Sequence, residues 1–140
     1  MRCKLLYYSH YCMIHPALYI DISEKKGKAV FTSAFINKQS VIEIAPVIVM
    51  NESDREFLDK TLLHDYIFEW GEDKKKCCMA LGNIPIYNHS YTSNCEYFMD
   101  FEEEQIFVKT VRDIQPGEEL TINYNGDWNN ADKVWFEVAE

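Results

Sequence analysis

Short apolar runs separated by polar turns make up most of this chain, and few of the runs have helical spacing. Runs of β-branched and aromatic residues bounded by turn residues predict strands. The runs of this kind are 18–22, 29–31, 41–45, 47–50, 97–101, 105–110 and 119–123. Pro46 separates two of them, so we expect two strands that meet at a bend. The acidic residues 102–104 lie between two others, which predicts a β-hairpin with an acidic tip.

Only one segment predicts a helix. Asn51 is a suitable N-cap, and Asp54 stands three residues later, in the position of a capping-box acid. We expect this helix to run from Glu52 to about Lys60, and the aromatic-rich stretch 63–70 to be extended. Many short strands with one short helix predict a mainly β fold.

Chain length sets the domain organisation that we expect. A chain of 140 residues without an internal repeat or a low-complexity linker predicts one domain. We assign that domain to 1–140, with its core at about 18–128 and a closing C-terminal segment at 129–140.

Charge narrows the range of partners. The chain has 23 acidic and 14 basic residues, for a formal net charge of -9. Such a surface repels phosphate, which argues against direct binding of nucleic acid and favours a basic partner such as a Lys/Arg-rich tail. The alternative is that the acidic surface serves solubility alone.

Cysteine spacing argues against a metal site. The five cysteines form no Cys-x-x-Cys pair, and no histidine stands at a ligand spacing from two of them. We expect no bound metal and free thiols in a reducing, intracellular setting. No stretch has the length of a signal peptide core or a membrane span, so we expect no membrane association.

Two polar motifs carry the candidate chemistry. Residues 87–95, Tyr-Asn-His-Ser-Tyr-Thr-Ser-Asn-Cys, crowd amides, hydroxyls and an imidazole into what reads as a loop. Such a loop suits the binding of a polar small molecule. The alternative is a turn-rich loop whose Asn and Ser side chains bond their own backbone. Residues 117–124, Gly-Glu-Glu-Leu-Thr-Ile-Asn-Tyr, read as a turn that leads into a strand ending on Tyr124.

Together these motifs resemble the two signature motifs of SET-domain protein lysine methyltransferases. Residues 26–31, Lys-Gly-Lys-Ala-Val-Phe, resemble the early Gly-x-Gly-Val-Phe turn of that family. The segments 36–43, 65–68 and 79–82 are similar to their counterparts as well, the last two most closely in the very small viral and bacterial SET proteins. The resemblance covers about 18–128. It implies several small sheets and a pseudoknot in which the C-terminal strand passes beneath the site loop.

The chain departs from the family pattern in three places. Ala29 replaces the second glycine of the early turn, where the backbone often approaches the methyl donor. Asn123 replaces the acid that often precedes the tyrosine. The cysteine-rich segment that binds zinc in many relatives has no counterpart here, so we expect Trp128 and the tail through Trp135 and Phe136 to close the site instead.

The resemblance implies transfer of a methyl group from S-adenosylmethionine to a lysine side chain, with a histone or histone-like basic protein as the expected substrate. Two alternatives remain open: a weakly active SET-like module that binds lysine-containing peptides, and a methyltransferase for a non-histone protein. A homodimer that completes the substrate groove is a further expectation. The expected location is the cytoplasm of a bacterium, the nucleus of a eukaryote, or the host nucleus for a viral or secreted protein.

The resemblance also assigns roles to individual residues. The expected cofactor-binding residues are Gly27, Lys28, Ala29, Asn88, His89 and Tyr124. Lys28 is equally well explained as a solvated lysine, and a mainly structural role for His89 stays open. His10, His15 and His64 receive no role.

Tyr124 is the expected catalytic residue, with its hydroxyl beside the transferred methyl group. The expected walls of the lysine channel are Tyr66, Tyr97, Ile122 and Trp128. For Tyr97 the alternative is cross-strand packing in the hairpin, and for Trp128 it is anchoring of the tail. Cys95 is expected to be a small packing residue and not a nucleophile.

Overall fold

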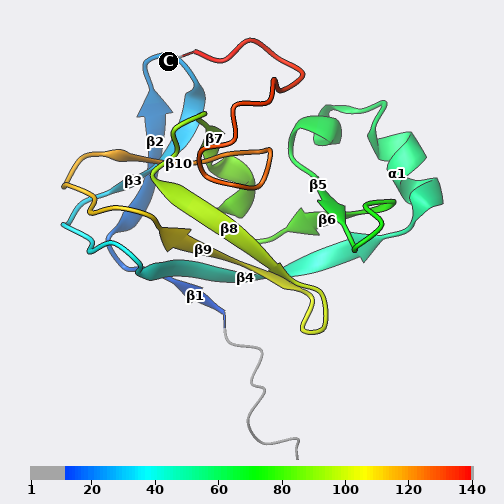
Figure 1. The fold of residues 1–140 in the computed structure, drawn as a ribbon, viewed down its shortest axis with the longest axis horizontal. Coiled ribbons are helices and arrows are strands. Elements are labelled where there is room, and N and C mark those ends of the chain that lie inside the picture. Colours follow the sequence, from blue (N-terminus) through cyan, green and yellow to red (C-terminus); the bar gives the residue numbers. More distant parts are fainter. Residues whose placement is uncertain (1–11, 140) are drawn as a thin grey trace, which may run out of the picture.

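The computed structural model describes residues 12–139, and two β-sheets account for most of the regular structure (Figure 1). The larger sheet has the strand order β5-β6-β4-β9-β8, and β1 also pairs with β4. Its strands are β1 (Met13–Ile14), β4 (Val41–Met50), β5 (Phe68–Trp70), β6 (Lys76–Ala80), β8 (Cys95–Asp100) and β9 (Gln105–Thr110). The mainly β fold predicted from the sequence is confirmed.

The smaller sheet has the order β2-β3-β10-β7. Its strands are β2 (Leu18–Ser23), β3 (Gly27–Thr32), β7 (Asn88–His89) and β10 (Glu119–Ile122). β10 pairs antiparallel with β3 on one side and parallel with β7 on the other, with Thr121 opposite Asn88 and Ile122 opposite His89. The two polar motifs of the sequence therefore meet inside one sheet.

β4 is one strand of ten residues, so the prediction of two strands that meet at Pro46 is wrong. The strand continues because its partner changes there. β9 pairs with β4 as far as Pro46, and β6 pairs with it from Val47 onward. Pro46 has no N–H to donate, but its carbonyl accepts a hydrogen bond from Leu81 N at 3.0 Å.

The predicted helix is α1 (Glu52–Leu58), which ends two residues earlier than expected. Asn51 caps it as predicted, since its Oδ1 accepts a hydrogen bond from Asp54 N at 2.9 Å. The predicted hairpin of β8 and β9 is confirmed as well.

The extended conformation predicted for 63–70 is wrong in its first half. Leu62–Asp65 form a 3-10 helix, η2, and only β5 is extended. The hydroxyl of Thr61 accepts a hydrogen bond from Leu63 N at 3.2 Å and so starts the helical turn. A second 3-10 helix, η3 (Ile84–Ile86), precedes β7.

Residues of both sheets and of η3 form one core. Tyr87 is its largest fully buried side chain, and Ile84 of η3, Ile42 of β4 and Leu120 of β10 belong to the same core. No helix among residues 12–139 is long and apolar enough to cross a bilayer.

One acidic side chain, Glu43 of β4, lies fully buried in this core. Its Oε1 accepts a hydrogen bond from Asn83 N at 2.6 Å, and its Oε2 accepts one from the Tyr87 hydroxyl at 3.0 Å. Burial raises the pKa of this carboxyl, although the same hydrogen bonds act in the opposite direction. Glu43 thus ties β4 to the segment that leads into β7.

We predict that Gly82→Ala destabilises the protein by about 2 to 4 kcal/mol. Gly82 has a φ of 66°, and a Cβ there would collide with Glu43 Oε1. Gly117→Ala is the matched control, because Gly117 also has a positive φ (85°) but a Cβ there meets nothing within 4 Å. It should cost only about 1 kcal/mol. Urea unfolding of the two variants measures the difference, and equal losses would show that the contact with Glu43 is unimportant.

Candidate active site

Asn88 of β7 joins two other strands through its side chain. Its Nδ2 donates hydrogen bonds to Lys28 O at 3.1 Å and to Glu119 Oε1 at 2.8 Å. The β3 turn and the site loop, which the sequence separates widely, are therefore adjacent. Gly27 and Lys28 are exposed at this point, beside the half-buried Asn88.

Ala29 fits its place without strain. It lies fully buried in β3 opposite Asp21, and it is not among the residues with a positive φ. The left-handed conformation of this turn falls on Gly27, with a φ of 76°. An alanine in place of the second glycine is therefore compatible with the fold of the turn.

His89 connects the two motifs from within the structure. Its side chain is buried, and its Nδ1 accepts a hydrogen bond from Tyr124 N at 3.1 Å. Its ring packs against Tyr91 and Tyr124, with centroid distances of 4.6 and 5.2 Å. Its backbone carbonyl accepts a hydrogen bond from Lys26 Nζ at 3.3 Å. The ring thus has a structural role, because it positions the backbone of Tyr124.

Tyr124 directs its hydroxyl proton at the backbone. The hydroxyl donates a hydrogen bond to Tyr87 O at 2.8 Å, which leaves its oxygen lone pairs for other donors. Burial raises the pKa of this phenol to about 12, with further contributions from Tyr66, Asp65 and Glu119. Tyr124 is therefore a neutral, oriented acceptor at ordinary pH.

Tyr97 of β8 lies next to Tyr124, to whose carbonyl its hydroxyl donates a hydrogen bond at 3.5 Å. Its ring also packs edge-on against Phe68 at 5.3 Å, so packing and a polar contact coexist. Burial raises the pKa of Tyr97 to about 12, and Glu69 is the next largest contributor. The side chains of Tyr97 and Tyr124 are thus two adjacent, neutral phenols.

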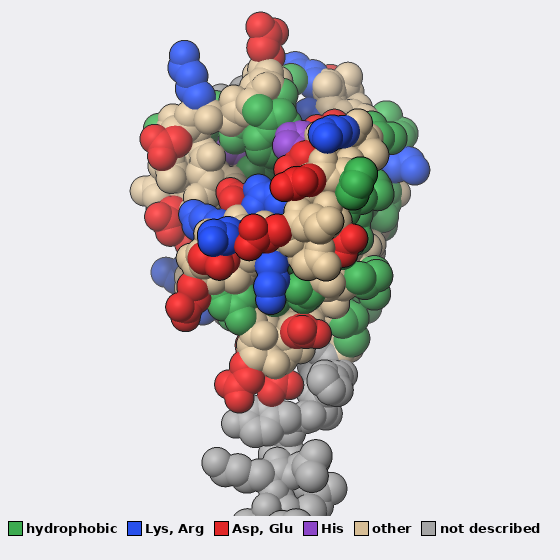
Figure 2. Space-filling model, turned by 90° about the vertical axis from the view of Figure 1, so that its right-hand side faces the viewer, with side chains coloured by type: hydrophobic (Ala, Val, Ile, Leu, Met, Phe, Trp, Pro, Cys, Tyr) green, Lys and Arg blue, Asp and Glu red, His purple; other side chains and the backbone are tan. Residues whose placement is uncertain are grey.

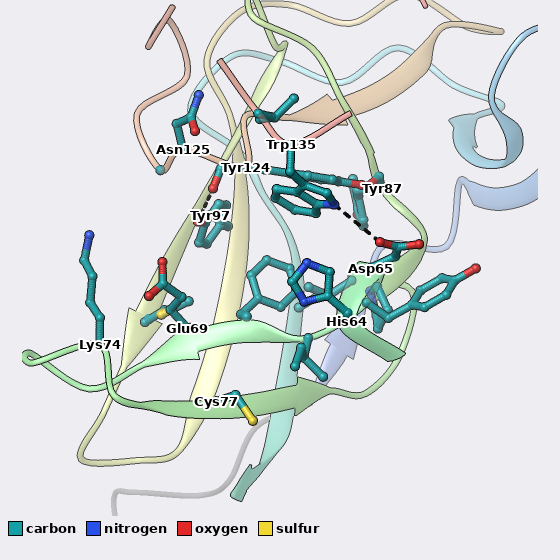
Figure 3. A pocket seen from close by; sticks show the side chains of 18 of the residues that line it. His64, Asp65, Glu69, Lys74, Cys77, Tyr87, Tyr97, Tyr124, Asn125 and Trp135 are labelled. Carbon is teal, nitrogen blue, oxygen red and sulfur yellow. Dashed lines mark hydrogen bonds between the residues drawn. The ribbon is translucent and has the colours of Figure 1, made fainter. Parts of the chain in front are cut away.

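Both tyrosines line a cavity of about 850 Å³ between η2, β5, β8 and the C-terminal tail (Figure 3). Tyr66 also lines it and is 38% exposed. The acidic lining residues are Asp59, Asp65, Glu69 and Asp132. The basic ones are Arg55, His64, Lys74 and Lys133. Figure 2 shows that acidic and basic side chains are interspersed on the face that Figure 1 has on its right, without a continuous basic field.

The tail covers this cavity with Trp135. Its indole stacks on Tyr124 with centroids 6.0 Å apart and 23° between the planes, and its Nε1 donates to Asp65 Oδ1 at 3.4 Å (Figure 3). Phe136 packs against both His89 and Tyr124. Trp135 and Phe136 of the tail thus both lie against Tyr124.

Two of the expected channel residues lie elsewhere. Trp128 lines a separate, shallow groove with Arg112, and its carbonyl accepts hydrogen bonds from Ser93 N and Oγ at 3.2 and 3.1 Å. Ile122 is fully buried in the core and does not line the cavity. Tyr66, Tyr97 and Tyr124 thus share the cavity, while Trp128 and Ile122 do not reach it.

Cys95 is fully buried, and burial raises the pKa of its thiol well above the ordinary value, as suits a packing residue. Among the described residues, no group of three or more His, Cys, Asp and Glu side chains is arranged to hold a metal ion.

Asn94 is a site residue to which the sequence analysis assigned no role. Its Oδ1 accepts a hydrogen bond from Thr121 N, and its Nδ2 donates one to Glu119 O, both at 2.8 Å. The amide therefore replaces a missing strand partner along β10. The position of Asn94 in a polar motif is the sequence signal that could have pointed to it. The sequence does not show, however, which strand its side chain bonds.

Comparisons with known proteins agree with this geometry. Residues 27–125 match the family model described as the SET domain. A histone-lysine N-methyltransferase of Schizosaccharomyces pombe, specific for H3 lysine-37, is 32% identical over 126 residues, which cover 89% of this chain and 80% of that protein.

Two solved structures are similar in fold. A candidate histone methyltransferase of Plasmodium falciparum superposes with a TM-score of 0.60 at 25% identity, covering 79% of this chain and 99% of that one. ATXR5, in complex with histone H3.1 mono-methylated on R26, superposes with a TM-score of 0.64 at 19% identity, covering 81% and 59%. At that lower identity the likeness to ATXR5 is one of fold alone.

We predict that Trp135→Ala lowers the pKa of Tyr124 from about 12 toward its ordinary value of about 10. Removing the stacked indole exposes the phenol, and burial is the main cause of the raised value. NMR titration of protein labelled at tyrosine 13Cζ measures it, with Tyr124→Phe to assign the signal. Trp128→Ala is the matched control, because that side chain lines the other groove. Equal shifts in the two variants would contradict the role given to Trp135.

Proposed function

The chain belongs to the SET-domain family of protein-lysine methyltransferases, and from that membership we propose that it transfers methyl groups from S-adenosylmethionine to a lysine of a histone or histone-like protein. The observation that carries the proposal is the parallel pairing of β7 with β10. That pairing brings Asn88, His89 and Tyr124 close together, beside an aromatic cavity that is large enough for a lysine side chain.

The residues around Asn88 fit S-adenosylmethionine. The methyl donor carries a carboxylate and an ammonium at one end. The exposed Lys28 ammonium matches the carboxylate, and the Asn88 Oδ1, whose amide nitrogen bonds Lys28 O and Glu119, can accept from the ammonium. A Cβ at Gly27 would meet nothing within 4 Å, so this turn leaves open space. Bound there, the donor supplies an activated methyl group on a sulfonium.

The cavity suits a lysine side chain that must arrive neutral. Free lysine has a pKa of about 10.4, so the site must disfavour its charged form. Burial among Tyr66, Tyr97 and Tyr124 removes water from the amine and lowers its pKa. The neutral phenol oxygens of Tyr97 and Tyr124 can then accept hydrogen bonds from the amine and align it.

Charge favours a basic substrate segment. The chain has a net charge of -9, and the acids Asp59, Asp65 and Glu69 line the cavity beside basic residues, with Asp59 and Glu69 paired to Arg55. The overall charge of the chain, and Asp65 at the cavity, are therefore what favour a basic segment. Residues that flank a target lysine in a histone-like tail carry positive charge, which an acidic protein attracts. A protein with this substrate would act at chromatin, in the nucleus of a eukaryote.

We predict that the wild-type protein binds S-adenosylmethionine in calorimetry and that Asn88→Ala weakens this binding about 10- to 100-fold. The substitution removes the amide that spans Lys28 and Glu119. Asn37→Ala is the control. The hydrogen bonds of Asn37 with Ser40 and Thr110 are made by its backbone carbonyl, which the substitution keeps.

The second arm of this test measures transfer from labelled donor to histone H3. Tyr124→Phe keeps the ring and the backbone of this expected donor-binding residue, so most donor binding should remain. Transfer should fall about 100-fold, because one aligned polar group is lost. Donor binding without transfer to any basic protein would favour a lysine-peptide binding module. An absence of donor binding by the wild type, even with a basic peptide present, would refute the proposed function.

The pH dependence of transfer is a separate prediction. At subsaturating peptide the rate should rise about tenfold per pH unit below the pKa of the target amine, because only the neutral amine reacts. Tyr97 and Tyr124, each with a pKa of about 12, stay neutral up to pH 10, so their ionisation should not reverse the rise. A fall in rate between pH 8 and 10, while circular dichroism shows folded protein, would contradict this assignment.

A further inference from the structure

The buried carboxylate of Glu43 has no part in the chemistry described so far, yet it bonds the residue on which the Tyr124 hydroxyl depends. We propose that Glu43 is a positioning residue: through Tyr87 it fixes the carbonyl that orients the Tyr124 hydroxyl toward the cavity. The catalytic consequence rests on the proposed function, whereas the structural coupling does not.

Tyr87 is the connecting residue, because its two ends serve different partners. Its hydroxyl points into the core and donates to Glu43 Oε2 at 3.0 Å. Its carbonyl accepts the hydroxyl of Tyr124 at 2.8 Å. Its side chain is 1% exposed, so the ring has no freedom to move without disturbing the core. A displacement of the ring would therefore move the carbonyl as well.

Glu43 holds this segment at its other end too. Its Oε1 accepts a hydrogen bond from Asn83 N at 2.6 Å. The backbone between the two contacts is the short helix η3, closed by a hydrogen bond of 2.8 Å from Ile86 N to Asn83 O. One carboxylate thus fixes both the start of the turn and the tyrosine at its end. An apolar side chain at this position would hold neither.

Stability alone does not account for an acid at this position. Burial of a carboxyl group costs free energy, as the raised pKa of Glu43 reflects, and an apolar side chain of similar size often stabilises a core as well or better. The hydrogen-bonded pair of Glu43 and Tyr87 is explained if its role is to fix the position of the Tyr87 backbone. The residues after Tyr87 support this view, because Asn88 and His89 follow directly and form β7.

The neighbouring backbone is also shaped around the carboxylate. Gly82 lies where any Cβ would collide with Glu43 Oε1, so the chain approaches the carboxylate more closely than another residue would allow. The close approach of Gly82 and the two hydrogen bonds define a single position for the carboxylate.

The test compares Glu43→Gln, Tyr87→Phe and the double variant with Ile114→Val as control. The glutamine keeps the shape of the side chain and an oxygen that can accept from Asn83 N, but its amide nitrogen can only donate to the Tyr87 hydroxyl, so that hydrogen bond is reversed. The phenylalanine removes only that hydroxyl. Ile114 is a fully buried residue bridged to Ile36, outside the turn that Glu43 holds, and its truncation disturbs core packing without removing a hydrogen bond of Glu43 or Tyr87.

The first readout needs neither donor nor substrate. In protein labelled at tyrosine 13Cζ, the Tyr124 signal, assigned with Tyr124→Phe, reports the hydrogen bond of its hydroxyl. We expect this signal to move in Glu43→Gln and in Tyr87→Phe, and to stay in place in Ile114→Val. An unmoved Tyr124 signal in folded Tyr87→Phe would overturn the proposal, even if Glu43→Gln does not fold.

The second readout is the rate of transfer at saturating donor. We expect kcat to fall about five- to twentyfold in each single variant, with KM for the peptide nearly unchanged, because alignment and not binding is lost. The double variant should be no slower than the worse single variant, since both changes alter one connection. Unchanged kcat despite a moved Tyr124 signal would overturn the catalytic part. If the wild type itself transfers no methyl group, the proposed function fails, and the NMR readout still decides the coupling.

Discussion

The backbone N–H and C=O groups of the buried strand β10 must all find hydrogen-bond partners, and the rest of this structure depends on this constraint. β10 runs through the interior, with Leu120 and Ile122 fully buried, and each of its peptide groups needs a partner there. β3 supplies partners on one side, β7 on the other, and the amide of Asn94 bonds Thr121 N and Glu119 O. The arrangement that meets this requirement is also the one that brings Asn88, His89 and Tyr124 together. The site is thus a consequence of hydrogen-bond satisfaction in the sheet.

Local signals explain which parts of the fold the sequence predicts. The Asn51 cap, the β8–β9 hairpin and the strand that leads to Tyr124 depend on neighbouring residues, and they formed as expected. Pro46 and the stretch 63–70 did not follow the prediction. The continuity of β4 depends on β6 and β9, and the start of η2 depends on one hydroxyl of Thr61. Neither partner can be identified from a pattern of apolar residues.

The site shows the same division. The resemblance to the family motifs predicts Asn88, His89 and Tyr124 as site residues, and the parallel pairing of β7 with β10 brings the two motifs together. Because the cysteine-rich segment of many relatives has no counterpart here, the sequence predicts that Trp128, Trp135 and Phe136 close the site, but it does not show which of them reach it. Trp128 and Trp135 stand in the same acidic tail, and the structure places only Trp135 on Tyr124. A tail without a regular element has no periodicity from which to predict the direction of a side chain.

The insertion of β10 between β3 and β7 has a consequence for the order in which the protein folds. β2–β3 and β8–β9 are hairpins of neighbouring segments and can form early, whereas the partners of β10 come from far earlier in the chain. Closing such long loops costs chain entropy before any contact compensates for it. During synthesis, a ribosome-bound chain that has not yet exposed β10 would hold β3 and β7 with open edges and lack Tyr124 altogether. We therefore expect the candidate active site to assemble late, and until then those edges need protection from pairing with other chains.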